Sequence, residues 1–260
     1  MDISVIKSRL SALQNPRGGQ KKDLSQTIWR PGVGKHSVRI VPSVFNKQNP
    51  FKEVYMHYGI NNRSMMALTN FGEKDPIVEF AQGLRKSSEK DNWQLAKKLE
   101  PKMRVFAPVI VRGEEDKGVR LWEFGKQVYM DLLSIAEDED VGDYTDPIQG
   151  RDITVETAGK ETTGLMYNTS TVRVRTKSTP LSEDSDKVKQ WLDNQPDPLT
   201  QFKRYSYDEM KEALLKHLNP EEDIKEQADQ VVSKQPESSQ YTLSTTKPSV
   251  DSAIDDLFDI

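Results

Sequence analysis

The last part of the chain, residues 221–260, constrains the fold most, because it cannot build a core. It holds ten acidic and three basic residues among Ser, Gln, Thr and Pro, a net charge of about −7. Segments of this composition bury too little apolar surface to offset the entropy of ordering them. We therefore expect a disordered acidic C-terminal tail over residues 221–260, with folding confined to the residues before it.

The charge of the preceding residues has the opposite sign. Residues 1–220 hold 34 of the 37 Lys and Arg and 31 of the 41 Asp and Glu, so their net charge is about +3. A mildly basic body with an acidic terminus is typical of a polyanion binder that carries its own competitor. Ile3, Ile6, Leu10 and Leu13 share one helical face, and a basic linker with Gly and Pro follows to residue 22. We expect a basic N-terminal arm over residues 1–22 and a core over residues 23–220.

Within the core, apolar periodicity predicts short strands interspersed with helices. The strands are expected at residues 37–41, 53–59, 103–111, 118–124, 151–156 and 165–177. Pro108 predicts an edge or a bulge in the third of these. Helices are expected after Asp75, over residues 91–99, after Gly125 and after Ser206, which opens a capping box. This order favours a mixed, β-rich α+β fold, an OB-type Greek-key barrel with a helical subdomain near residues 60–100.

Several classes of function are disfavoured by the composition. The chain has no cysteine, so thiol nucleophiles and Cys-ligated metals are excluded, and its three histidines lack metal-ligand spacing. No apolar run approaches the length of a membrane span. No Ser–His–Asp set is indicated. We expect a protein that is not an enzyme, binds no metal or cofactor and does not contact a membrane.

Aromatic and basic residues alternate throughout the core. Single-stranded nucleic acid needs this pairing, because cations neutralise phosphates and aromatic faces stack the unpaired bases. The period of two along residues 172–177 places Arg173, Arg175 and Lys177 on one sheet face. The candidate nucleic-acid-binding residues on this pattern are Tyr55, Tyr58, Arg63, Lys102, Arg104, Phe106, Arg112, Trp122, Lys126, Tyr167, Arg173, Arg175 and Lys203. Which aromatics face the ligand depends on strand register, because a slip of one residue reverses the face.

An ordered set of short motifs gives the chain a family resemblance. The motifs are SVRIVPS at residues 37–43, FAPVIV at 106–111, FGK at 124–126 and the ending IDDLFDI at 254–260. Together they resemble the single-stranded DNA-binding, helix-destabilising protein of T-even bacteriophages, the gene-32 type. The resemblance implies an OB-type core that binds single strands in a cleft. It places Arg39, Lys102, Phe106, Trp122, Lys126 and Tyr167 where the family has cleft cations or aromatics.

The resemblance also assigns roles to both ends of the chain. Lys7, Ser8 and Arg9 are similar to the basic motif of an arm that binds the next copy along the strand and makes binding cooperative. The acidic ending is similar to a tail that competes for the cleft and recruits replication and recombination proteins. Its residues are Ile254, Asp255, Asp256, Leu257, Phe258, Asp259 and Ile260. The implied location is the cytoplasm of an infected bacterial host, and the protein's own mRNA is a further implied partner.

One departure concerns a structural zinc that the resemblance implies, held by one His and three Cys. His57 lies at the histidine position, but residues 75–79 (DPIVE) stand where two of the thiols are expected. Carboxylates and apolar side chains do not replace soft thiolate ligands. We therefore expect no zinc, and expect the subdomain to be held by apolar packing of Ile77, Phe80, Leu84, Trp93 and Leu95.

The sequence thus predicts cooperative, sequence-independent binding of single-stranded DNA in replication, recombination and repair. Trp122, Phe106 and Tyr167 are expected to stack on bases. Two alternatives stay open. One is an interaction or scaffold protein that recruits partners through its tail, and the other is an RNA-binding translational regulator, since no 2′-hydroxyl readout is visible in the sequence.

Overall fold

The computed structural model describes residues 24–219, and the expected arm and tail lie outside these residues. Eight strands form one sheet: β1 (Ile28–Trp29), β2 (Gly34–Ile40), β3 (Lys52–Ile60), β4 (Arg63–Met66), β5 (Lys102–Val111), β6 (Arg120–Phe124), β7 (Arg151–Ala158) and β8 (Thr169–Ser178). The order is β1-β6-β5-β2-β7-β8, and β3 pairs with β4 and β5. Only the short β1–β6 pair is parallel. The expected β-rich α+β fold is confirmed, but the described strands do not close into the expected barrel.

β5 is the central strand of the sheet, so the expectation of an edge or a bulge at Pro108 is wrong. On one side residues 105–109 of β5 pair with β6; on the other, residues 102–106 pair with β3 and residues 109–111 pair with β2. Pro108 lies between these two partners. Its missing N–H therefore leaves no ladder bond unmade. Its carbonyl still accepts from the Val41 N–H at 3.0 Å.

Six α-helices flank the sheet in the described part of the chain: α2 (Pro76–Arg85), α3 (Lys90–Leu99), α4 (Lys126–Glu137), α5 (Lys160–Thr163), α6 (Ser185–Asp193) and α7 (Tyr207–Leu218). The expected starts of two of them are confirmed. Asp75 caps α2 by accepting from the N–H groups of Ile77 and Val78, and Ser206 opens a complete capping box with Glu209. None of these helices is long and apolar enough to cross a membrane.

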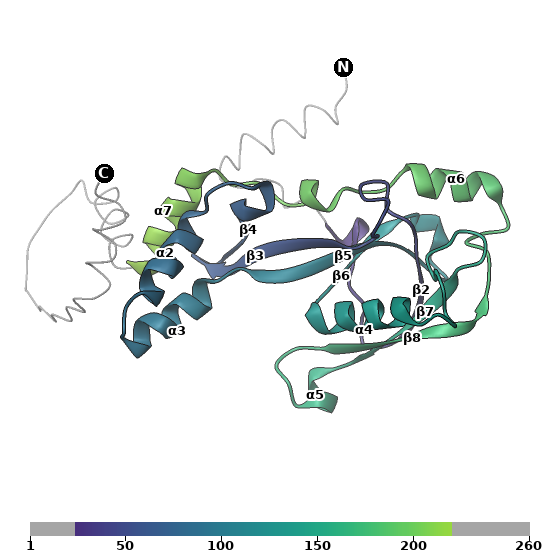
Figure 1. Ribbon diagram of the computed structural model, residues 1–260, viewed down its shortest axis with the longest axis horizontal. Helices are drawn as coiled ribbons and strands as arrows, with labels where there is room; N and C mark the ends of the chain where they lie inside the picture. The colour runs from purple at the N-terminus through teal and green to yellow at the C-terminus, as the bar shows by residue number, and fades with distance from the viewer. Residues whose placement is uncertain (1–23, 220–260) are drawn as a thin grey trace, which may run out of the picture.

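The molecule is elongated, with a helical lobe at one end and most of the sheet at the other (Figure 1). The lobe consists of α2, α3 and α7 with the β3–β4 hairpin, and its core includes Ile77, Phe80, Leu84 and Met65. α7 completes it from the far end of the core sequence through Met210 and Leu214. The expected packing of Ile77, Phe80 and Leu84 is confirmed, and Leu95 packs against them half-buried. Trp93 does not: it is 46% exposed.

A buried, hydrogen-bonded His–Asp pair lies where the resemblance implies a metal. His57 and Asp75 are fully buried, with Nε2 of His57 3.2 Å from Oδ2 of Asp75. Nδ1 of His57 is 2.9 Å from the Leu99 carbonyl, and the Asp75 carboxylate also accepts from the Leu68 N–H at 2.8 Å. The pair therefore ties β3 to the segments that start α2 and end α3.

These residues do not fit a zinc ion. Both ring nitrogens of His57 already face acceptors, and the chain supplies no thiolate. Within residues 24–219, no group of three or more His, Asp and Glu is placed to hold a metal. Burial alone raises the pKa of the Asp75 carboxyl. Hydrogen bonds from His57 and from the backbone of Leu68 and Val78 outweigh that effect, so the pKa lies below its usual value.

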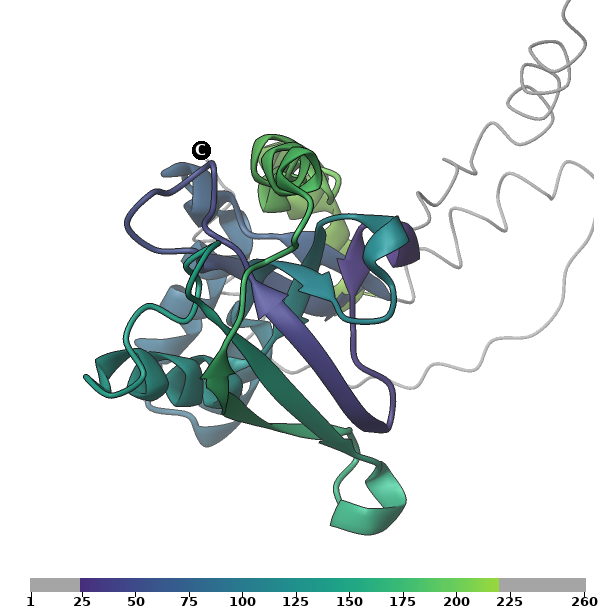
Figure 2. The same cartoon turned by 90° about the vertical axis from the view of Figure 1, so that its right-hand side faces the viewer.

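The body of the sheet has its own core, in which Trp122, Phe124 and Val105 pack with Leu132 of α4 and Val155 of β7. The β7–β8 hairpin projects from this body and carries α5 at its tip (Figure 2). One face of the hairpin therefore packs on the core near its base, whereas the tip extends beside the β6–α4 corner.

Candidate nucleic-acid interface

A groove of about 810 Å³ separates the β6–α4 corner from the tip of the β7–β8 hairpin. One wall comes from residues 30–31 after β1, from β5, from β6 and from the start of α4, and the other comes from the hairpin. The lining residues are Arg30, Pro31, Arg104, Trp122, Glu123, Phe124, Gly125, Gln127, Val128, Thr157, Lys160, Met166, Tyr167, Asn168, Thr169 and Ser170. The groove therefore combines cations, hydroxyl and amide groups with aromatic and apolar side chains.

Two arginines of the groove share one carboxylate. Arg30 Nε donates to Glu123 Oε2 at 2.7 Å, and Arg104 Nε lies 3.8 Å from Glu123 Oε1. Arg104 also donates to the Tyr58 hydroxyl at 3.2 Å, and its guanidinium lies 5.5 Å from the centre of the Tyr58 ring. Glu123 neutralises only one of the two guanidinium charges. This wall therefore keeps a net positive charge next to a partly exposed aromatic ring.

The hairpin tip supplies exposed apolar surface on the other wall. Met166 is 90% and Tyr167 is 63% exposed, and Lys160 on α5 lines the groove beside them. Large side chains that face solvent beside a cation suit base stacking better than core packing. Of the three aromatics expected to stack, Tyr167 is the one with an accessible ring.

The helical lobe carries a second aromatic group with cations, which sequence reasoning missed. Trp93 lies between Arg85 and Lys97, whose charged groups are 5.8 and 5.5 Å from its ring centre. The pattern within α3 contains the signal. Asn92, Ala96 and Leu99 occupy the buried face, so the neighbouring Trp93 points away from it.

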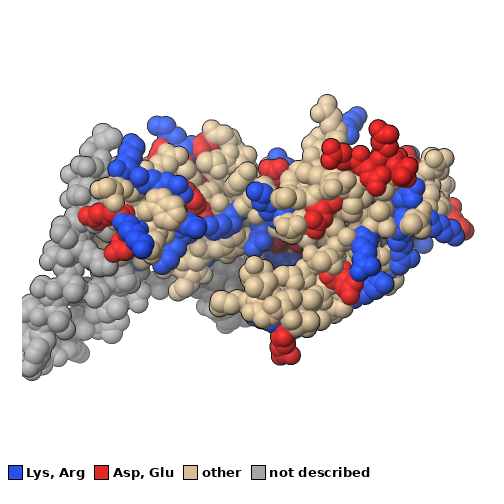
Figure 3. Space-filling view, turned by 60° about the horizontal axis from the view of Figure 1, so that its bottom comes forward, with Lys and Arg blue, Asp and Glu red and all other residues tan. Residues whose placement is uncertain are grey.

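Lys102 links this part of the lobe to the groove. Its Nζ lies 3.2 Å from the Lys97 carbonyl at the end of α3, and Arg104 follows two residues later on the same strand. Alternation along a strand places residues 102 and 104 on one face. Figure 3 shows Lys and Arg side chains over the lobe at the left and toward the middle of this side of the molecule. We call Lys97, Lys102, Arg104 and Arg30 the basic strip.

Two of the expected DNA-binding arginines have their guanidinium groups bound by the protein instead. Arg39 is fully buried; it donates to Asp152 at 3.0 Å and to Thr179 O and Oγ1 at 2.9 and 2.7 Å. Arg112 donates to the same carboxylate and to the Leu181 carbonyl at 2.9 Å. Burial lowers the pKa of Arg39, and Asp152 counters that effect. The expectation that Arg39 contacts DNA is wrong in this structure, and Arg112 has its guanidinium engaged by the protein.

Two expected stacking residues are also buried. Phe106 and Trp122 are each 1% exposed. Trp122 packs with Trp29 and Phe124 at ring-centre distances of 5.7 and 4.6 Å, and Phe106 lies 5.7 Å from Phe202. Neither ring offers a face to a base. The expectation that they stack on bases is therefore wrong, because the strand register turns both toward cores.

Other expected residues lie outside the groove. Lys203 pairs with Glu209 at 2.8 Å and lies over Tyr205. Arg63 lines a polar recess on the lobe with Tyr205 and Glu212. Tyr55 is partly exposed on β3. Lys126 is exposed at the first residue of α4, between two groove residues in the sequence.

Arg173 and Arg175, two of the expected nucleic-acid-binding residues, also lie outside the groove. The two arginines and Lys177 share one face, as the alternation predicted, and they line a recess with Lys35. Thr157 and Ser170 pair with each other and line the groove, whereas the paired Thr154 and Arg173, three positions away on each strand, line the recess. An odd separation reverses the side of a strand. The cations therefore lie on the opposite face of the hairpin from the groove.

Comparison with known families gives one match. A family model described as gp32 DNA binding protein like matches residues 32–221, which include every described strand and α-helix from β2 to α7. No curated protein matches the sequence significantly.

Proposed function

The chain belongs to the gp32-like family of DNA-binding proteins, and on this premise we propose that it binds single-stranded DNA along the basic strip and the groove. The observation that supports this path most is the arrangement of Arg104, which lies between the Tyr58 ring and the groove. Guanidinium groups there neutralise phosphates, and the accessible rings of Trp93, Tyr58 and Tyr167 stack on bases. Stacking tolerates every base, so sequence preference is slight. Bound cations release counterions, so affinity falls steeply with salt.

The exposure of the four tryptophans makes a direct test. Trp29, Trp122 and Trp191 are buried, and Trp93 is exposed. Titration with poly-dT at two salt concentrations is expected to quench the fluorescence of Trp93, with weaker quenching at the higher salt. Trp93→Phe is expected to abolish the quenching while labelled poly-dT still binds by anisotropy. If neither quenching nor an anisotropy change occurs in the unaltered protein, the DNA-binding proposal fails and a scaffold role takes its place.

The two ends of the chain carry the finer parts of the proposal, and both lie outside the described residues. Lys7, Ser8 and Arg9 act in an arm that contacts the next copy along the strand. The tail residues 254–260 occupy the groove when DNA is absent and compete with DNA for it, because a tethered anionic segment has a high effective concentration near the cations. Ile254, Leu257 and Phe258 add an apolar pattern that suits recruitment of replication and recombination proteins.

In this proposal the protein acts in phage DNA replication, recombination and repair in the cytoplasm of the infected host. It has no enzymatic activity. None of the contacts above recognises a 2′-hydroxyl, so a preference for DNA or for RNA is determined by a direct competition binding experiment. Equal binding of poly-dT and poly-U would favour a role on its own mRNA in addition.

A further inference from the structure

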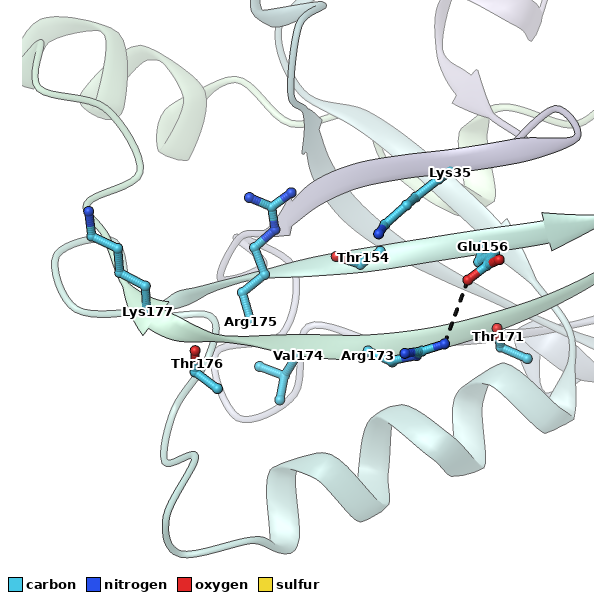
Figure 4. A pocket seen from close by; sticks show the side chains of 9 residues that line it. All are labelled: Lys35, Thr154, Glu156, Thr171, Arg173, Val174, Arg175, Thr176 and Lys177. Carbon is cyan, nitrogen blue, oxygen red and sulfur yellow. Dashed lines mark ion pairs between the residues drawn. The ribbon is translucent and has the colours of Figure 1, made fainter.

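The face of the β7–β8 hairpin opposite the groove is strongly cationic. Lys35 of β2 and Arg173, Arg175 and Lys177 of β8 line a recess of about 410 Å³ there, with Glu156 as its one acidic lining residue. Figure 4 shows Arg175 and Lys177 on one side of β8, and Val174 and Thr176 on the other. We call these four basic residues the cationic face.

Little in the described structure neutralises this face. Arg173 lies 3.7 Å from Glu156, but the two side chains are 80% and 56% exposed, so solvent screens the pair. Lys35, Arg175 and Lys177 form no ion pair with another described residue. Thr154 and Thr171 add hydroxyl donors among the cations. Four cations against one carboxylate, interspersed with neutral donors, match a chain of phosphates.

The hairpin tip joins the cationic face to the groove. The two strands of the hairpin lie between the groove and the cationic face. After residue 158 of β7 the hairpin ends in α5 and the exposed residues Leu165, Met166 and Tyr167. Lys160 lies at the same end and lines the groove. A strand leaving the groove therefore meets apolar surface at the tip. The cations of the opposite face follow toward the base of the hairpin, from Arg173, which pairs with Thr154, to Lys177.

We propose that one single strand occupies both surfaces, by running through the groove, turning over the hairpin tip and laying its phosphates on the cationic face. The ligand of the cationic face is thus the phosphodiester backbone of the strand already bound in the groove. Bases stack at the tip, and Arg173, Arg175, Lys177 and Lys35 contact phosphates only. This inference rests on the proposed function and specifies its path.

Oligonucleotide length separates the two surfaces experimentally. Labelled dT oligonucleotides of about 5 and about 15 nucleotides span the range of site sizes found for OB-type binders. Their affinities are measured by anisotropy over a range of salt for the full chain, for the variant R175Q/K177Q and for the control variant K187Q/K189Q. The control removes the same charge from α6, where both lysines are exposed.

R175Q/K177Q is expected to weaken binding of the long oligonucleotide and to leave binding of the short one equal to that of the control. Each phosphate contact on a single strand contributes about 0.7 to the slope of log K against log salt, so the slope for the long oligonucleotide falls by about 1.4. Equal losses for both lengths, or a loss no larger than in K187Q/K189Q, overturn the wrapped path. If the unaltered protein binds neither oligonucleotide, the proposed function itself fails.

Discussion

At the scale of single residues, the buried Asp75 has four hydrogen-bond partners to lose. Its buried carboxylate binds His57, the Leu68 N–H and the first turn of α2. Removing one member of a buried pair leaves the other without its partner and costs about 3–5 kcal/mol. We expect Asp75→Asn to lower the free energy of unfolding by about 3 kcal/mol in urea titrations. Asp91→Asn, an exposed acid in the first turn of α3, is the matched control and is expected to change little.

The same carboxylate makes stability depend on pH. The pKa of Asp75 is lowered in the folded protein. Its contribution is therefore fully present above the unfolded value of about 3.9 and is lost as the pH falls through the folded pKa. The unfolding midpoint of the unaltered protein should decline in that acidic window, and Asp75→Asn should lack this part of the decline. Parallel pH profiles for the two proteins would contradict the role of the carboxylate.

Tyr167 tests the groove at the same scale. Its ring is exposed at the hairpin tip, so truncation removes stacking without opening a core. We expect Tyr167→Ala to weaken binding of single-stranded DNA by about 1–3 kcal/mol, measured by anisotropy with labelled dT oligonucleotides. Tyr167→Phe keeps the ring and should bind like the unaltered protein. A similar loss in both variants would mean that the hydroxyl, not the ring face, makes the contact.

At the scale of elements, two glycines are expected to respond in opposite directions. A Cβ at Gly150 would lie 2.3 Å from the Asp146 carbonyl oxygen, in the turn before β7, whereas a Cβ at Gly83 in α2 meets nothing within 4 Å. We expect Gly150→Ala to destabilise the protein by about 1–3 kcal/mol through overpacking. Gly83→Ala should stabilise it by about 0.5–1 kcal/mol through helix propensity. Urea unfolding of both variants measures the two changes in the free energy of unfolding. Changes of the same sign in both variants would contradict this expectation.

Most elements could be predicted from the sequence, because alternation, capping residues and helical periodicity are local. The partners of strands that lie far apart in the sequence could not be predicted. Pro108 indicated an edge because a proline opposite a partner strand leaves one ladder hydrogen bond unmade. In the structure β5 changes partner from β3 to β2 at that residue, so no bond is lost. Arg173 and Arg175 were correctly placed on one face, but only the register with β7 shows that this face is opposite the groove.

The site was predictable in its chemistry and less so in its members. Arg104, Tyr58 and Tyr167 carry the expected pairing of cations and rings. Phe106 and Trp122 have the same residue types but are buried, because both sides of β5 and β6 are covered in their region. Arg39 was misassigned because its carboxylate partner, Asp152, is far away in the sequence. Long-range burial was the missing information in each case.

At the scale of the whole molecule, the two ends of the chain should have separable effects. Removing residues 1–14 is expected to abolish cooperative binding to long single strands while sparing affinity for short oligonucleotides. Removing residues 250–260 is expected to tighten binding or speed duplex melting at low salt, because the competing negative charge is lost. Binding isotherms on poly-dT and melting curves of a duplex check both. Unchanged cooperativity in the first variant, or unchanged binding and melting in the second, would reassign that segment.

The shared strand β5 has a consequence for how the molecule opens. Its first half pairs with β3, which belongs to the lobe, and its second half pairs with β2 in the body. Separating the lobe from the body would disrupt the pairing of β5, which also pairs with β2 of the body. The lobe and the body should therefore open as one cooperative unit. Native-state hydrogen exchange should therefore give the protected amides of β3 and β2 the same opening free energy, equal to that of global unfolding. Such a core would hold the lobe and the groove in fixed alignment while strands bind and leave.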